Sequence, residues 1–132
     1  MIYQEIYDGA VQLVNEDSEQ NDPADYNRRA GYILATFSTI AAPLDVVYRK
    51  NHSLAPLLEK SFSYVNFERN FPLSDVFIPA AIYYLAAMLV IDENEAMSDK
   101  LFDLYVNEMA TIQAEKPIAV TEKTADRYGL LR

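Results

Sequence analysis

The sequence predicts an all-α fold, a bundle of about four helices, and two observations support that class. Apolar residues recur at steps of three and four in several long segments, which is the spacing of one helix face. Residues typical of helix starts, such as aspartate before proline, precede these segments. The 132 residues fit one domain, which we divide into a helical domain over 1–116 and an extended C-terminal arm over 117–132.

The first two helices follow from these patterns. A helix is predicted over residues 2–15, followed by a polar, solvated loop over 16–22. Asp22 and Pro23 then begin a long second helix, predicted over 23–49, with a kink at Pro43 because proline lacks the N–H that helix bonding requires. Its apolar stripe is expected to face the core and consists of Tyr26, Ala30, Ile33, Leu34, Phe37, Ile40, Ala41, Leu44, Val47 and Tyr48.

Residues 50–73 carry no clear helical periodicity. A short helical turn is expected over 54–60. The following stretch, 61–71, contains aromatic and β-branched residues that alternate imperfectly, which predicts either a short β segment or an irregular, ordered loop.

The third helix is predicted to begin at Asp75 as its cap and to continue to Ile91. It is apolar on every side, so it must be enclosed by its own domain, by neighbouring subunits, or by both. The fourth helix is predicted over 93–114, with Asp92 as cap and Glu95 completing a capping box. We expect it to bury Met97, Leu101, Leu104, Tyr105, Met109 and Ile112.

Composition and charge exclude several classes of function. The chain has no cysteine, and its net charge of −9 repels phosphate backbones, so sequence-specific nucleic-acid binding is not expected. The longest apolar run, residues 76–91, is shorter than the roughly 20 residues of a membrane span. Residues 1–5 show no sign of a secretory signal.

No catalytic, cofactor-binding or metal-binding residue is predicted. His52 is the only histidine, and a solvated loop position is expected for it. The acidic cluster over 92–103 fails the calcium-loop pattern, because Met97 occupies the glycine position and Asp103 the glutamate position. The basic pairs at 28–29 and 49–50 could make weak phosphate contacts, but salt bridges to the acidic excess are favoured.

Tyrosine is abundant, with ten tyrosines, six phenylalanines and no tryptophan. A tyrosine ring combines a large apolar surface with a polar tip, which suits surfaces that become buried on assembly. The same rings could equally fill the core of the monomer, and the sequence leaves both interpretations open.

One part of the chain resembles a known family. The segments are Phe71-Pro72-Leu73-Ser74-Asp75, the apolar run Ala80-Ala81-Ile82-Tyr83-Tyr84-Leu85-Ala86-Ala87-Met88-Leu89, the acidic turn Asp92-Glu93-Asn94-Glu95, and Leu101-Phe102-Asp103-Leu104-Tyr105. Together they resemble head–tail connector proteins (adaptor or head-completion proteins) of tailed double-stranded DNA bacteriophages and prophages. Asp126-Arg127-Tyr128-Gly129 also suits that pattern, whereas two residues separate Pro72 from Asp75, unlike the family's Leu-Pro-Asp-like entry.

The resemblance implies a structural subunit of the phage neck. Such a subunit forms a ring of about a dozen identical copies between the portal protein and the tail. The ring continues the DNA channel without sequence-specific DNA contact and docks the next neck or tail protein. The protein would then be made in the bacterial host cytoplasm and reside in the virion. The candidate subunit or portal interface comprises Phe62, Tyr64, Phe67, Tyr83, Tyr84, Tyr128, Leu130 and Leu131.

An alternative reading of the same residues is a small helical module that binds or regulates one protein partner, as a monomer or a dimer. An enzyme is not supported by any pattern in the chain.

Overall fold

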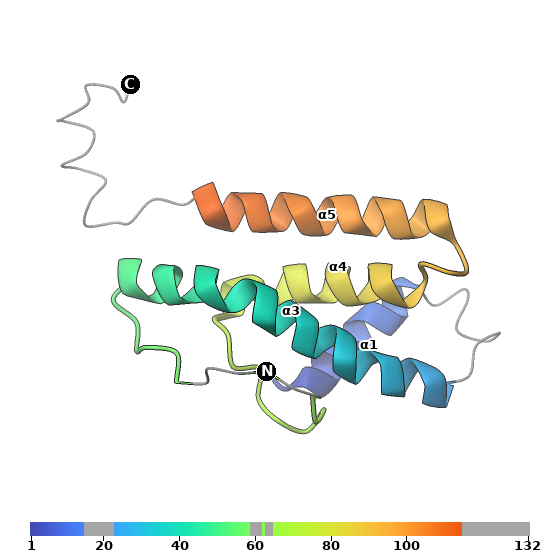
Figure 1. Cartoon of the computed structure of the whole chain (residues 1–132), viewed down its shortest axis with the longest axis horizontal. Coiled ribbons are helices and arrows are strands. Elements are labelled where there is room, and N and C mark those ends of the chain that lie inside the picture. Colours follow the sequence, from blue (N-terminus) through green and yellow to red (C-terminus); the bar gives the residue numbers. More distant parts are fainter. Residues whose placement is uncertain (15–22, 59–61, 63–64, 115–132) are drawn as a thin grey trace.

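The computed structural model describes residues 1–14, 23–58, 62 and 65–114. Over this part the chain is helical and contains no β-strand, which confirms the predicted all-α class. The elements are α1 (Tyr3–Leu13), α3 (Pro23–Asn51), the 3₁₀-helix η1 (Asp75–Phe77), α4 (Ile78–Leu89) and α5 (Glu95–Ala114) (Figure 1).

Helix α4 is at the centre of the fold. It packs against α5, α1 and α3, and α5 runs alongside it after a tight turn (Figure 1). Six of its twelve residues are buried, and four of these are alanines, whose small side chains let the neighbouring helices approach closely. The sequence left open whether this helix is enclosed by its own domain or by neighbours, and its own domain encloses most of it.

An aromatic cluster fills the core between α3, α4 and α5. Phe37 of α3 is fully buried, and its ring contacts those of Phe71, Tyr84 and Tyr105 at centroid distances of 6.4, 5.9 and 6.2 Å. The hydroxyl of the buried Tyr3 meets the hydroxyl of Ser38 at 3.1 Å, so both polar tips are satisfied inside the core. Many tyrosine rings therefore belong to the monomer's own core.

The start of the chain is held by backbone bonds to a distant segment. The N–H groups of Tyr3 and Gln4, in the first turn of α1, donate to the carbonyls of Arg69 and Phe67 at 3.0 and 2.9 Å. First-turn N–H groups have no partner within their own helix, so these carbonyls replace a side-chain cap. Ile2 and Asn70 form an isolated antiparallel bridge. The segment predicted as a short strand or an ordered loop is thus an irregular loop wherever it is described.

Several predicted helix limits need correction. The predicted helical turn over 54–60 is absent over 54–58, the part that is described. Asp75 does not cap α4: it begins η1, and Phe77 occupies the position before the α-helix, which ends at Leu89 rather than Ile91. The cap of α5 is Asn94 and not Asp92, because the Asn94 side-chain oxygen accepts the Met97 N–H at 3.0 Å.

Burial also differs from prediction at the edges of two helix stripes. Ile40 and Val47 of α3 and Leu104 of α5 were predicted to face the core, yet all three are exposed. Helix α3 continues through Pro43 to Asn51, and the kink there stays a prediction. The predicted loop over 16–22 and the arm over 117–132 lie outside the described residues.

Candidate interaction surface

In the described part of the chain, no three His, Asp or Glu side chains gather closely enough to hold a metal ion. His52 follows the end of α3, where its ring lies 4.2 Å from that of Tyr48. The features that distinguish the surface are apolar patches.

The outer face of α3 is uncharged over much of its length. Between Arg29 and Asp45 the sequence contains no charged residue. The helix exposes Tyr32, Ile40 and Val47, beside the polar Thr36 and Thr39, and Ile40 and Val47 lie at the edge of its buried face. An exposed apolar stripe of this kind is typical of a surface that another protein covers. We call the three apolar residues the α3 stripe.

Helix α3 is also long and apolar enough, over Tyr26–Asn51, to cross a membrane by length and composition. The core helix of a soluble protein passes the same test. Here the inner face of α3 packs on α4, and it buries the carboxylate of Asp45.

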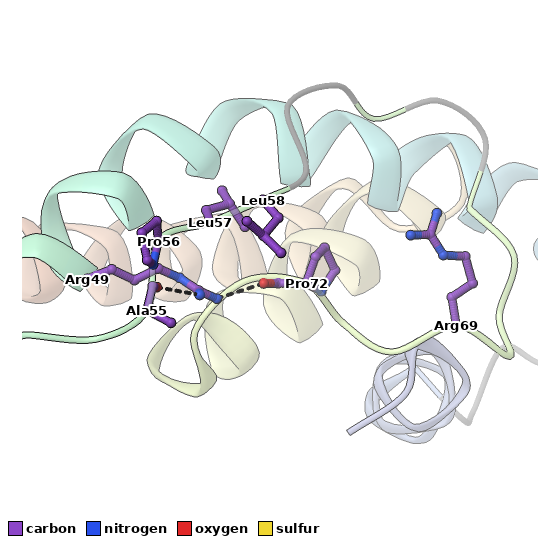
Figure 2. A pocket seen from close by; sticks show the side chains of 7 residues that line it. All are labelled: Arg49, Ala55, Pro56, Leu57, Leu58, Arg69 and Pro72. Atoms are coloured by element: carbon purple, nitrogen blue, oxygen red, sulfur yellow. Dashed lines mark hydrogen bonds between the residues drawn. The ribbon is translucent and has the colours of Figure 1, made fainter.

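A groove lies at the C-terminal end of α3, where the chain turns back after Asn51. Two adjoining cavities of about 570 and 360 Å³ form it, and they share Arg49, Pro56 and Leu57. Figure 2 shows Arg49 and Arg69 at opposite ends of the larger cavity, with Leu57 and Leu58 between them. We call this feature the α3 groove; its lining residues are Val46, Arg49, Lys50, Leu54, Ala55, Pro56, Leu57, Leu58, Arg69 and Pro72.

A buried ion pair fixes the shape of the α3 groove. Asp45 is fully buried, and its Oδ2 accepts the Arg49 Nε–H at 2.7 Å, while its Oδ1 accepts the Ser74 N–H at 3.3 Å. The remaining Arg49 nitrogens donate to the carbonyls of Ala55 and Pro72 at 3.0 and 2.8 Å (Figure 2). The Arg49 side chain therefore connects α3 to both walls of the groove through hydrogen bonds. The predicted salt bridge of Arg49 is confirmed.

The α3 groove is basic in an acidic protein. Six basic side chains occur in the described residues, and three of them, Arg49, Lys50 and Arg69, line the groove. Among the described residues that line it there is no carboxylate, but the buried Asp45 lies 2.7 Å from the Arg49 Nε and balances the charge of that side chain. The apolar side chains between these cations are well exposed, and Leu58 retains 88% of its surface. Because Asp45 already pairs with Arg49, the groove offers mainly apolar surface with Lys50 at its edge, which suits a partner segment with apolar side chains.

A second exposed surface, on α5, combines apolar and acidic side chains. Phe102 and Val106 are four residues apart, so they share one flank of the helix, and both are exposed. Glu95, Asp99 and Asp103 follow the same spacing beside them and are exposed as well. We call these five residues the α5 flank.

The predicted interface residues that are described lie partly buried against the core. The Phe67 ring stacks on that of Tyr7 at 5.0 Å, and Phe62 and Tyr83 also pack on core residues. Tyr84 contacts the ring of Tyr105 at 5.0 Å, and burial raises the pKa of both phenols. Tyr64, Tyr128, Leu130 and Leu131 lie outside the described residues.

Sequence reasoning missed the α3 stripe and the α3 groove. The charge-free run over 30–44 is visible in the sequence and could have indicated a helix whose outer face is covered by a partner. The groove has no such signal, because contacts between residues far apart in sequence build it.

Comparison with known proteins finds no matching family model, no matching curated protein and no matching solved structure.

Proposed function

We propose that the protein is a structural subunit of a bacteriophage neck, forming a ring between portal and tail that continues the DNA channel and docks the next neck or tail protein. The motifs that resemble head–tail connectors fall on one structural unit, from Phe71 through η1 and α4 to α5. These are packing motifs, and they form the centre of the fold.

The observation that carries the proposal is the presence of two different apolar surfaces on one small chain. The α3 stripe with the adjoining α3 groove is one surface, and the α5 flank is the other. A ring of identical subunits requires two unlike patches that meet head to tail, whereas a twofold dimer needs only one self-complementary patch.

The charge of the chain is compatible with a DNA channel. With a net charge of −9, a ring of many copies repels the DNA backbone, so DNA slides past without adhering. No sequence-specific contact with DNA is required.

The proposal is tested with purified protein, alone and mixed with portal particles, by native mass spectrometry and electron microscopy. We expect closed rings of many copies, or added density on the portal. A stable monomer or dimer that never adds to portals would contradict the proposal and favour a module that binds a single partner. Deleting the gene from the phage should yield DNA-filled heads without joined tails.

A further inference from the structure

We propose that the segment after α5, residues 115–132, turns back over the end of α3 and that its first apolar residues cover the α3 groove of the same chain. The inference goes beyond the proposed ring and does not depend on it, because the contact lies within one subunit. It rests on where α5 ends, on the apolar surface that begins there, and on the sequence of the segment that follows.

Helix α5 ends beside the end of α3. Figure 1 shows the last turns of the two helices at the same end of the fold. A small cavity of about 130 Å³ lies between them, and Ile112 and Gln113 of α5 line it together with Val47 and Asn51 of α3. The chain therefore leaves α5, after Ala114, next to the last turn of α3.

Exposed apolar side chains lead from this point into the α3 groove. Val47, in the small cavity, is 53% exposed, and its neighbour Val46, in the groove, is 50% exposed. Leu54, on the other wall of the groove, is 48% exposed. Consecutive residues of a helix point about 100° apart, so Val46 and Val47 together span much of the outer side of α3 at this level. The apolar surface thus begins where the C-terminal segment begins.

The segment is long enough to cross this surface. The Leu54 N–H donates to the Arg49 carbonyl at 2.8 Å, which holds Leu54 beside the last turns of α3. A path to it around half of one helix, about 10–12 Å wide with its side chains, is roughly 16–19 Å long. Extended chain covers about 3.3 Å per residue, so residues 115–120 reach about 20 Å from Ala114.

The residues that arrive at the groove by this path are apolar. The sequence there is Pro117-Ile118-Ala119-Val120, which carries no charge. Proline is unfavourable inside a helix, so continuation of α5 through this sequence is not expected. In an extended segment Ile118 and Val120 share one side, and they can pack together on Val46 and Leu54. The contact requires apolar burial and no charge pairing.

Its attachment to α5 identifies this segment as the occupant of the groove. A tethered segment has an effective concentration in the millimolar range, so a small apolar contact that would be weak between separate molecules is populated within one chain. Residues 128–131 lie beyond the contact and stay available for the proposed subunit or portal interface. Tyr32 and Ile40 of the α3 stripe lie nearer the start of the helix and stay uncovered.

A single cysteine in the groove tests the contact, because the natural chain contains none. The reaction rate of Leu54→Cys with a soluble maleimide reports whether the groove is covered. Adding Ile118→Asp/Val120→Asp should raise this rate by about fivefold, because the groove is then open most of the time. The matched control, Thr121→Asp/Thr124→Asp, adds the same charge to the segment but keeps its apolar pair, so the rate should not change.

Val106→Cys is the control for the position of the cysteine. Val106 lies on the α5 flank and is as exposed as Leu54 (45% and 48%), so its rate should be the same with and without Ile118→Asp/Val120→Asp. Circular dichroism verifies that every variant is folded. If Leu54→Cys also reacts at an unchanged rate, the segment does not cover the groove and the inference is wrong.

Cross-linking shows which chain supplies the segment. Leu54→Cys/Val120→Cys is treated with a short bis-maleimide at low protein concentration, and mass spectrometry should find both cysteines linked within one monomer. Val106→Cys/Val120→Cys should give little of this product. Products that join two chains would show that a neighbour's segment fills the groove, and absence of any link would show that the segment lies elsewhere; either result overturns the contact. Portals are not needed, so these outcomes are independent of the test of the ring.

Discussion

Replacing Asp45 by asparagine should destabilise the fold through the ion pair that shapes the α3 groove. Asp45 is fully buried, whereas 18% of the Arg49 side chain is exposed. Removing one partner of a fully buried pair costs about 3–5 kcal/mol. Arg49 keeps two carbonyl acceptors and some contact with water, so we expect the loss of unfolding free energy to be about 2 kcal/mol, below that range.

Urea unfolding, monitored by circular dichroism, measures this loss of unfolding free energy. With a slope of about 2 kcal/mol per molar urea, Asp45→Asn should lower the midpoint by about 1 M. Lys50→Ala, a change at the exposed neighbouring cation, is the matched control and should leave the midpoint unchanged.

The relative unfolding free energies of the single and double variants distinguish an ion pair from simple packing. Arg49→Met alone leaves the buried carboxylate without its cation, so it should cost more than Asp45→Asn. Adding Asp45→Asn to Arg49→Met should then restore part of the stability. If the two losses simply add, the two side chains do not interact, and the reasoning about the groove is wrong.

Three further predictions concern other parts of the fold. Asn94→Ala should cost about 1 kcal/mol of unfolding free energy through loss of the α5 cap, whereas Asp92→Ala should leave the urea midpoint unchanged; equal losses would contradict the assignment of the cap. Gly9→Ala should stabilise α1 by up to about 1 kcal/mol if Ile82 shifts slightly, because the added carbon meets only that side chain, with its Cδ1 at 3.2 Å and its Cγ1 and Cγ2 at 3.6 and 3.8 Å; a loss of stability in the same assay would show that Ile82 cannot move. Burial, together with a neighbouring phenol, raises the pKa of Tyr105, so the unfolded chain loses its proton first and stability should fall as pH rises above about 10; Tyr105→Phe should make this fall shallower between pH 9 and 11.

Local sequence patterns predicted where the helices lie, because the spacing of apolar residues indicates which face of a segment is buried. They predicted helix ends less well. Asp92 and Asn94 are both suitable caps, and the choice depends on how the tight turn after α4 places the chain. Similarly, Asp75 is a good cap by type, but η1 intervenes before α4 begins.

The candidate site depended on information that periodicity does not contain. Ile40 and Val47 lie at the edge of the set of apolar residues that the sequence predicts to face the core, and only the positions of the neighbouring helices decide that they remain exposed. An all-apolar helix such as α4 gives no sign of which side faces its own chain. The groove arises from contacts of Arg49 with residues 55 and 72, which no local pattern reveals.

The backbone bonds that hold the start of the chain have a consequence for its synthesis. Helix α1 is made before the segment that holds it, because Phe67, which accepts the Gln4 N–H, is 63 positions further along, and α4 follows later still. At about 5–20 residues per second, synthesis of those 63 residues takes roughly 3–13 s. Ser38, which meets the hydroxyl of Tyr3, is made before them. During that interval Ile6, Tyr7 and Ala10 lack α4, the helix on which α1 packs, so nascent chains on one messenger carry an apolar helix face that completion of α4 removes from water.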